Sequence, residues 1–295
     1  MRLYSFEWQG AARLGVALPD ATKLLDLTEA APELPKNAVQ FISQFPESAA
    51  AITELLQSKH KPNWLHDLEA VRLFAPVPRP GKILCSGINY RSHLQENPGA
   101  ILPEEPFFFA KLPSAVIGPN QPIRLTRHSK QVDYEIEFAV VIGRTMRHTP
   151  ELDVLEHVFG YTILHDVSAR DVQFRDNQIT LGKNFDTFCP IGPCVVTRDE
   201  VPHPDRIGLR TFLNGQKMQE GSTADWVFSL GRLLSFLSGR ITLEPGDVVS
   251  TGTPAGVGVF RKPPIFLRSG DVVRLEADHV GTLQNEVTQD VTNLK

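Results

Sequence analysis

The chain has 295 residues, of which 41% are hydrophobic and 22% are charged, and its net charge is −4. This composition is typical of a globular protein, and the length allows one large domain or two. The absence of a basic run argues against a nucleic-acid partner. The apolar runs are too short to span a membrane, so we expect no membrane partner.

The cysteine content and the N-terminal residues predict the cellular compartment. No charged region followed by a long apolar core is evident at the N-terminus, so we expect no signal peptide. Cys85, Cys189 and Cys194 form an odd set without the spacing of zinc ligands. We interpret them as small buried hydrophobic residues in a reducing compartment, and we predict a cytoplasmic protein.

The first part of the chain predicts a small α/β domain. Two short alternating strands precede a turn at Pro19–Asp20, and residues 37–58 show the apolar spacing of a helix. Residues 76–81 form a stiff linker, because each proline in it restricts its own backbone and that of its neighbour. The predicted domains are therefore residues 1–75 and 76–295.

The segment after the linker carries a candidate general base. A core strand over residues 82–87 leads into a predicted helical turn, on which His93 and Glu96 are neighbours at a spacing of three. A carboxylate beside an imidazole raises its basicity and fixes its orientation, as a general base requires. The alternative is an ordinary surface pair at a helix end. The residues that follow, up to Pro106, are a candidate lid.

Residues 133–143 read as an apolar strand that carries acids on one face. Because side chains alternate along a strand, Glu135 and Glu137 should project from the same face, roughly 7 Å apart, with Asp133 on that side as well. Clustered acids need a cation, and oxygen ligands suit Mg²⁺, Mn²⁺ or Ca²⁺. The alternative is a solvated polar face on an edge strand. Asp166, near the end of a second apolar strand, adds a further carboxylate.

Two segments after Asp166 offer groups for an anionic ligand. A short helix places Arg170 and Gln173 on one face, and Lys183 lies in a glycine-flanked loop, where a solvated lysine is the alternative. Residues 251–258 form a glycine-rich loop whose N–H groups and hydroxyls can approach a ligand closely. This loop lacks the lysine and the spacing of a phosphate loop, which excludes nucleotide binding.

The remaining pattern predicts a β-rich architecture. A threonine cap and a proline predict a helix from Thr149 to about Phe159, and Asn214–Gly215 predicts a hairpin over residues 209–218. We further expect a buried strand at 107–111, a leucine-spaced helix at 230–237, and strands at 248–250, 271–277 and 281–287.

In combination these motifs resemble the fumarylacetoacetate hydrolase family over about residues 80–290. The resemblance implies an α+β fold, a mixed β-sheet roll or sandwich with few helices, beside a small N-terminal α/β domain, and a homodimer. His165 is a departure, because many relatives carry Asn there. The residues that carry the resemblance are Gly87–Tyr90, His93, Glu96, Asp133–Glu137, Asp166–Gln173, Gly182–Asp186 and Thr251–Gly258.

The resemblance also implies roles for individual residues. It places Mg²⁺ or Mn²⁺, with Ca²⁺ as a substitute in crystals, on Glu135, Glu137 and Asp166. It makes His93, Glu96 and Lys183 catalytic, and it puts Arg170, Gln173 and Thr253 around a small 2-oxo acid substrate.

The predicted function is metal-dependent hydrolysis of a C–C bond in a β-diketo acid such as an acylpyruvate, through an enolate stabilised by the metal and Lys183. Two alternatives use the same enolate: decarboxylation of oxaloacetate, and isomerisation or tautomerisation of an unsaturated 2-oxo acid. A binding protein that retains a degenerate site is a non-enzymatic alternative. Because these motifs serve all three reactions, the choice depends on the shape of the pocket.

Overall fold

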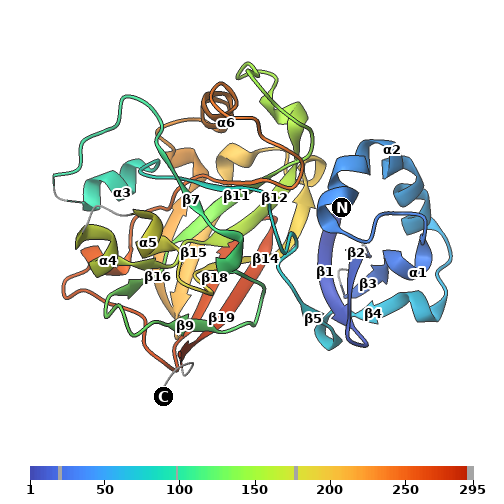
Figure 1. Ribbon diagram of the computed structural model, residues 1–295, viewed down its shortest axis with the longest axis horizontal. Helices are drawn as coiled ribbons and strands as arrows, with labels where there is room; N and C mark the ends of the chain where they lie inside the picture. Colours follow the sequence, from blue (N-terminus) through green and yellow to red (C-terminus); the bar gives the residue numbers. More distant parts are fainter. Residues whose placement is uncertain (19–21, 98, 176–178, 291–295) are drawn as a thin grey trace.

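A computed structural model describes residues 1–18, 22–97, 99–175 and 179–290 of the chain. Over these residues the protein has the predicted α+β fold of mixed sheets with few helices. Figure 1 shows the N-terminal residues as a smaller lobe beside a larger body of strands. The turn predicted at Pro19–Asp20 lies outside the described residues.

The largest sheet has twelve strands among the described residues and contains both parallel and antiparallel pairs. Its hydrogen-bonded order is β4 (Leu65–Asp67), β3 (Lys23–Asp26), β2 (Ala11–Ala17), β1 (Arg2–Trp8), β14 (Cys189–Thr197), β12 (Val158–His165), β11 (Ile136–Ile142), β17 (Val248–Ser250), β6 (Ile83–Ser86) and β7 (Phe108–Lys111), with β5 (Arg72–Leu73) on β1 and β8 (Val116–Ile117) on β14.

Two smaller sheets complete the strand architecture of the described residues. One has the order β16 (Gln216–Ser222), β15 (Gly208–Leu213), β18 (Val272–Ala277), β19 (Gly281–Gln289) and β9 (Ile123–Leu125), and the other pairs β10 (Val132–Asp133) with β13 (Ser168–Ala169). The hairpin predicted around Asn214–Gly215 is confirmed, since both residues have positive φ and join β15 to β16.

The helices are short apart from α2, and they lie at the periphery of the sheets (Figure 1). The predicted helices at 37–58 and 230–237 are confirmed as α2 and α6. The Asn37 side chain caps α2 by accepting from the N–H groups of Val39 and Gln40. The helices of the described residues are α1 (Leu27–Ala30), α2 (Ala38–Gln57), α3 (Arg91–Glu96), α4 (Arg170–Arg175), α5 (Ile179–Lys183) and α6 (Leu230–Ser238).

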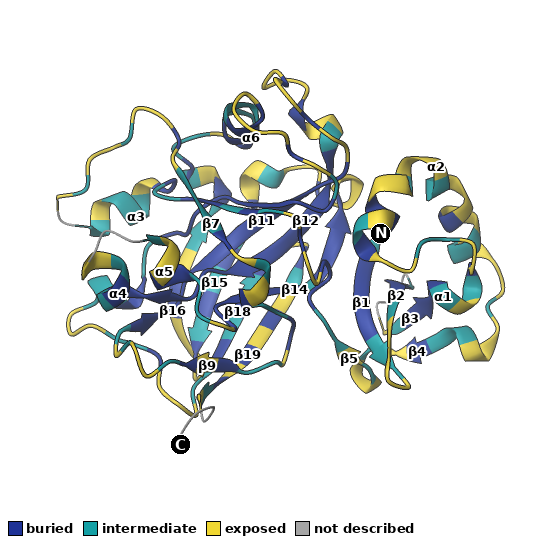
Figure 2. Cartoon of the chain, in the orientation of Figure 1, coloured by how far each residue is buried: buried dark blue, intermediate teal, exposed yellow. Residues whose placement is uncertain are grey.

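Strand β11 lies at the centre of the molecule and is buried on both faces (Figure 2). Phe138 and Val140 pack into one hydrophobic cluster with residues of the five-stranded sheet. Ala139 and Val141 pack into a second cluster, which contains Phe41 of α2. This alternation is the predicted one, and it makes β11 a rigid support for the acids at its N-terminal end.

The N-terminal lobe shares the largest sheet with the rest of the chain. Strand β1 pairs antiparallel with β14, with Leu3 opposite Val195. The lobe contains strands β1 to β5 together with α1 and α2, as expected of a small α/β unit. The division into domains at residues 75 and 76 stays a prediction.

Two expected elements differ in the structure. The helix predicted from Thr149 to Phe159 is wrong: a 3₁₀ turn covers Val154–His157, and β12 begins at Val158. Val158 pairs with Ile142 of β11, so strand pairing overrides the local capping signal. The strand predicted over residues 133–143 is interrupted between β10 and β11.

Two compositional expectations can also be compared with the structure. Cys85, Cys189 and Cys194 are unpaired and buried, which confirms their interpretation as small hydrophobic residues. Among the described residues, none of the helices combines the length and the apolar character needed to cross a membrane.

Candidate metal centre and active site

Three buried acids converge where two neighbouring strands begin and end. Glu137 is the second residue of strand β11, and Glu135 directly precedes that strand. Asp166 directly follows β12. Strands β11 and β12 run antiparallel with Ile136 opposite His165, so the register brings these carboxylates together. One oxygen from each of the three lies within 4.8 Å of the others.

The Glu135 carboxylate is held between two cations. Its Oε1 accepts from Arg170 Nη2 at 2.6 Å, and its Oε2 accepts from Lys183 Nζ at 2.7 Å. Burial alone would raise the pKa of Glu135, but the charges of Arg170 and Lys183 hold it well below its usual value. Glu135 is therefore ionised despite being buried.

Lys183 was expected in a loop but ends helix α5, where it is buried. Its ammonium group bridges Glu135 and Asp166. Burial would lower the pKa of Lys183, but the two carboxylates raise it, so the lysine is a fixed positive charge inside the site. It is not a solvated lysine.

The Glu137 carboxylate has no cationic partner within ion-pair distance among the described residues. Its Oε2 accepts only from the Ser250 hydroxyl and the Gly252 N–H. Burial, followed by the charges of Asp166 and Glu135, raises its pKa well above the usual value. A buried carboxylate beside two others with nothing to neutralise it is the feature that a bound cation would stabilise.

Lys111 is a functional candidate that the sequence did not reveal. It ends strand β7 and is 1% exposed. Its ammonium group donates to Asp166 Oδ1 at 2.6 Å, to the Val167 carbonyl at 3.3 Å and to the Lys183 carbonyl at 2.6 Å. An ammonium group has three protons, so these acceptors satisfy it completely. In the sequence, its only distinguishing feature is its position at the end of an apolar run that begins with three phenylalanines.

Asp133 does not join the acidic cluster, contrary to its expected place on the same face. Its carboxylate accepts from Arg170 Nε at 3.0 Å and from the N–H groups of Gly258 and Val259 at 2.7 and 3.0 Å. The break between β10 and β11 turns it away from Glu135 and Glu137. Asp133 thus anchors the glycine-rich loop.

The predicted histidine–glutamate pair is present on helix α3. His93 Nδ1 lies 2.7 Å from Glu96 Oε1, and both side chains are mostly buried. The second oxygen of Glu96 accepts from the Gly256 N–H at 2.8 Å. The glutamate is therefore held by the glycine-rich loop, and the ring of His93 is held by the glutamate.

The glycine-rich loop at 251–258 binds carboxylates of the protein itself. The N–H groups of Gly252, Gly256 and Gly258 donate to Glu137, Glu96 and Asp133 in turn. We expected these groups to face a ligand, and the structure shows instead that they position acidic side chains.

Thr253 lies in the same loop and is buried. Its hydroxyl accepts from Gln219 Nε2 at 2.8 Å, and Gln219 Oε1 accepts from the Ile136 N–H at 3.1 Å. Gln219, a second residue that the sequence did not reveal, thereby ties the loop to the start of β11.

Arg170 and Gln173 share a face of helix α4, as predicted. Arg170 Nη1 donates to Gln173 Oε1 at 3.2 Å, while the other guanidinium nitrogens bind Asp133 and Glu135. Arg170 is buried and fully engaged, so its first effect is to orient these acids. Gln173 also lines the cavity, and its amide nitrogen can donate two hydrogen bonds.

His165 precedes Asp166 and is fully buried, and neither ring nitrogen has a hydrogen-bond partner among the described residues. Burial and the charge of Lys111 lower the pKa of His165 to about 3. The ring is therefore neutral and adds no charge to the site.

These residues surround a cavity of about 160 Å³, which suits a small ligand. Every predicted site residue except Glu96 lines it. Apolar side chains, including Phe107, Phe109 and Phe260, form the rest of its wall. A cavity in which buried acids, a lysine and an oriented histidine converge is typical of an enzyme active site.

The charges in this centre fit a divalent cation. The cluster and its neighbours hold four carboxylates, namely Asp133, Glu135, Glu137 and Asp166, against the three cations Lys111, Arg170 and Lys183. The unmatched carboxylate is that of Glu137, and its neighbours in the cluster offer hard oxygen ligands.

Comparisons with known proteins agree with this arrangement. The family model described as fumarylacetoacetate (FAA) hydrolase C-terminal matches residues 82–288. The chain therefore belongs to the fumarylacetoacetate hydrolase family.

Among its relatives, "Oxaloacetate tautomerase fahd2, mitochondrial" of Xenopus laevis is 42% identical over 97% of this chain and 90% of that protein. "Oxaloacetate tautomerase YisK" of Bacillus subtilis (strain 168) is 39% identical over 91% of this chain and 94% of that protein.

Among solved structures, maleylpyruvate hydrolase from Sphingobium sp. SYK-6, in complex with manganese(II) and pyruvate, matches with a TM-score of 0.81 at 32% identity, over 98% of this chain and 99% of that one. Other similar structures are named as isomerases. The family is thus one of enzymes that includes tautomerases, hydrolases and isomerases.

Proposed function

We propose that the protein is a divalent-metal-dependent enzyme that interconverts the keto and enol forms of oxaloacetate. The observation that carries this proposal is the buried Glu137 carboxylate, which forms no ion pair with a cation of the described residues although Glu135 and Asp166 lie in the same cluster. The names of the most similar curated relatives support oxaloacetate as the substrate. Tautomerisation of an unsaturated 2-oxo acid was among the alternatives that the sequence left open, whereas oxaloacetate was considered only as a substrate for decarboxylation.

Glu135, Glu137 and Asp166 would hold Mg²⁺ or Mn²⁺, and a manganese complex of a similar enzyme supports this choice. When bound, the ion supplies a Lewis acid that polarises the carbonyl group of the 2-oxo acid. The chain adds the charge of Lys183, which is fixed in the site and stabilises negative charge that develops on the substrate oxygen.

His93 is the proposed base. With Nδ1–H donating to Glu96, its Nε2 carries a lone pair on the cavity side. His93 takes a proton from C3 of oxaloacetate, the electron pair of that C–H bond forms the C2–C3 double bond, and the 2-oxo oxygen takes up a proton. Since one proton leaves carbon and one reaches oxygen, the product is the enol and no other reactant is needed.

The substrate carboxylates need donors. Gln173, through its amide nitrogen, and Thr253, through its hydroxyl proton, are the proposed ones, and Arg170 holds Gln173 in place. A cavity of about 160 Å³ favours a short dicarboxylic acid over a long diketo acid.

A second candidate is hydrolysis of a C–C bond in an acylpyruvate, which we predicted first from the sequence. It is favoured by the same His93–Glu96 pair, which can deprotonate a water molecule, and by the likeness to maleylpyruvate hydrolase. Decarboxylation of oxaloacetate is a third candidate, which uses the same enolate. The cytoplasmic location also stays a prediction, since one relative is named as mitochondrial.

The test follows the enol absorbance of oxaloacetate with Mg²⁺ present and measures pyruvate in the same reaction. We expect catalysed enol–keto exchange without pyruvate, and a loss of about 10²- to 10⁴-fold in His93→Gln with Mn²⁺ affinity retained. His128, which stacks on Phe185 outside the cavity, provides the matched control His128→Gln. Cleavage of acylpyruvates without exchange would select hydrolysis, and pyruvate formation would select decarboxylation.

A further inference from the structure

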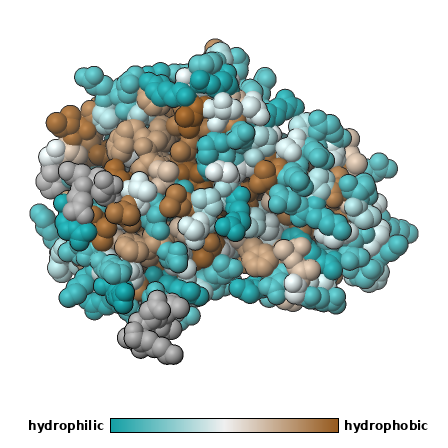
Figure 3. All heavy atoms as spheres, viewed as in Figure 1, coloured by the Kyte–Doolittle hydropathy of each residue, from teal (hydrophilic) through white to brown (hydrophobic). Residues whose placement is uncertain are grey.

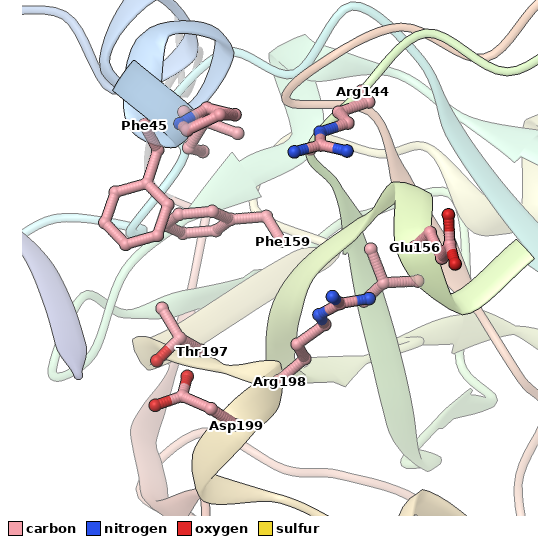
Figure 4. A pocket seen from close by; sticks show the side chains of 11 residues that line it. Phe45, Arg144, Glu156, Phe159, Thr197, Arg198 and Asp199 are labelled. Atoms are coloured by element: carbon pink, nitrogen blue, oxygen red, sulfur yellow. The ribbon is translucent and has the colours of Figure 1, made fainter. Parts of the chain in front are cut away.

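A second cavity lies between helix α2 of the N-terminal lobe and strands β11, β12 and β14 of the largest sheet (Figure 4). It has a volume of about 190 Å³ and is bordered by helix α2, by the loop after β11, and by residues around the ends of β12 and β14. The candidate metal centre lies at the other end of the β11–β12 pair, where Ile136 faces His165. The two cavities have no lining residue in common among the described residues.

One wall of this cavity is apolar and aromatic. Phe45 of α2 and Phe159 of β12 meet edge to face, with ring centroids 5.1 Å apart and planes at 88° (Figure 4). Ile42, Pro46 and Val158 extend the same wall. A planar apolar group could stack against these rings.

The opposite wall carries two arginines, Arg144 and Arg198. Neither Arg144 nor Arg198 forms an ion pair with a described residue, and Arg198 donates only to the Leu155 carbonyl. In Figure 4 both guanidinium groups lie among the residues that border the cavity, on the side facing Phe159. A carboxylate that binds guanidinium groups forms short, charge-assisted hydrogen bonds.

Two acids, Glu156 and Asp199, also border the cavity. Figure 4 shows the Glu156 carboxylate directed away from Arg144. Asp199 lies beside Thr197, and although burial would raise its pKa, the Thr197 hydroxyl and the Met1 amino group lower it. Asp199 is therefore ionised, and although the charge of Arg198 also helps to lower its pKa, these two side chains form no ion pair.

We propose that this cavity is a second ligand site, which binds a small carboxylate bearing an apolar or aromatic group. The carboxylate pairs with Arg144 and Arg198, and the apolar group packs against Phe45 and Phe159. The volume of about 190 Å³ is below that of sites for drug-sized molecules, which limits the ligand to about one ring. Because Phe45 belongs to α2, the N-terminal lobe completes the site.

The test uses 4-fluorobenzoate as a probe and fluorine NMR titration of the full chain, with Mg²⁺ and excess oxalate present to occupy the candidate metal centre. We expect saturable binding in the millimolar range and no binding of the neutral analogue 4-fluorobenzamide. Arg144→Gln should weaken binding about tenfold, because it removes a charge-assisted contact. The Arg144 side chain is exposed and forms no ion pair with the residues that the structure describes, so this variant should fold normally.

Arg240→Gln is the matched control, since Arg240 is an exposed arginine like Arg144 and lies over Phe236, outside the cavity. It should bind the probe like the unmodified protein. Equal binding of the amide, equal affinities in Arg144→Gln and Arg240→Gln, or no saturable binding in the unmodified protein would each overturn the proposal. A probe displaced by raising oxalate would place it in the metal centre and would overturn the proposal as well.

Discussion

Glu135 and Glu137 are two residues apart and equally buried, yet their environments differ. Glu135 touches two cations, while Glu137 accepts only from a hydroxyl and an N–H group. The charges of its two cationic neighbours lower the pKa of Glu135 despite its burial. Burial and the neighbouring carboxylates raise the pKa of Glu137. A proton on Glu137 is therefore what a metal ion would displace.

This difference predicts a pH-dependent metal affinity. Below the raised pKa of Glu137 the carboxyl is protonated in the folded protein, so Mn²⁺ must release that proton and its affinity should rise about tenfold per pH unit. Above that pKa the affinity should level off. Calorimetry in buffers of different ionisation enthalpy counts the released protons. Glu137→Gln should bind Mn²⁺ more weakly and without this slope, and an unchanged slope would contradict the assignment.

The same shift affects the stability of the metal-free protein. A carboxyl whose pKa is raised on folding stabilises the native state only while it is protonated. The free energy of unfolding without metal should therefore fall as the pH rises from the ordinary value of 4.5 through the raised pKa. Urea unfolding across this range measures the fall, which Glu137→Gln should reduce. A Glu137 that titrates normally would give the same profile in both proteins.

Lys111 predicts a large stability effect at a single position. Lys111→Met leaves the buried Asp166 carboxylate without one of its two cations, and breaking a buried pair costs about 3–5 kcal/mol. Lys82 is the matched control, since it also pairs with two acids, Glu244 and Asp247, but is partly exposed. Lys82→Met should cost about 1 kcal/mol or less. Equal losses in urea unfolding would show that Lys111 is not a buried anchor.

The sequence was informative about acids but not about their partners. Alternation along a strand predicted that Glu135 and Glu137 act together, Asp166 was expected as the further carboxylate, and the structure places all three in one cluster. Lys111 and Asp166 are 55 residues apart in the sequence and meet only in the folded sheet, so no local pattern predicts their contact. The separate role of Asp133 also depends on a distant loop.

At the level of elements, the glycine-rich loop joins the histidine–glutamate pair to the acidic cluster. Gly256 has a φ of +106°, and a Cβ added there would lie 2.3 Å from the Met218 carbonyl oxygen. Its N–H group also donates to Glu96. The loop is glycine-rich because side chains would clash with neighbouring parts of the protein. From the sequence we had attributed the glycines to the close approach of a ligand.

Gly256→Ala should therefore lower the free energy of unfolding by about 1–3 kcal/mol from backbone strain, with the steric clash adding to this. It should also lower turnover, because the loop that holds Glu96 shifts. Gly270→Ala is the control: its φ is +93°, but nothing lies within 4 Å of the added Cβ. Urea unfolding and the exchange assay compare the two variants. Equal effects on turnover would remove the loop from the catalytic arrangement.

Local signals predicted most elements, and strand pairing explains the failures. The Asn214–Gly215 turn, the capped helix α2 and the apolar helix α6 all follow from short-range patterns. The helix expected from Thr149 does not form, because Val158 pairs across the sheet with Ile142. A long-range hydrogen-bond ladder of this kind cannot be read from a capping residue.

At the scale of the whole molecule, exposed apolar side chains gather near the helices beside the site. Figure 3 shows brown patches over the region where Figure 1 places α3, α4 and α5. The exposed large apolar residues there include Ile101, Leu102, Phe107, Phe174 and Leu181, which are 42–85% exposed. Contiguous exposed apolar surface often marks an interface between proteins.

The predicted homodimer provides a partner for this surface. Light scattering coupled to size exclusion should give twice the chain mass of 32.8 kDa. Leu181→Glu should shift the protein towards the monomer, because it buries a charge in the interface. Leu152→Glu is the control, since Leu152 is 94% exposed but lies near the 3₁₀ turn at Val154–His157. A monomeric unmodified protein would show the homodimer prediction to be wrong.

We propose that Glu135, Glu137 and Asp166 hold one divalent ion between them. The most direct measurement is anomalous diffraction from crystals grown with Mn²⁺ and oxalate. The account predicts one strong manganese peak with an oxygen from each of these residues at about 2.0–2.4 Å. A peak elsewhere, or no peak while Lys183 still bridges Glu135 and Asp166, would contradict it.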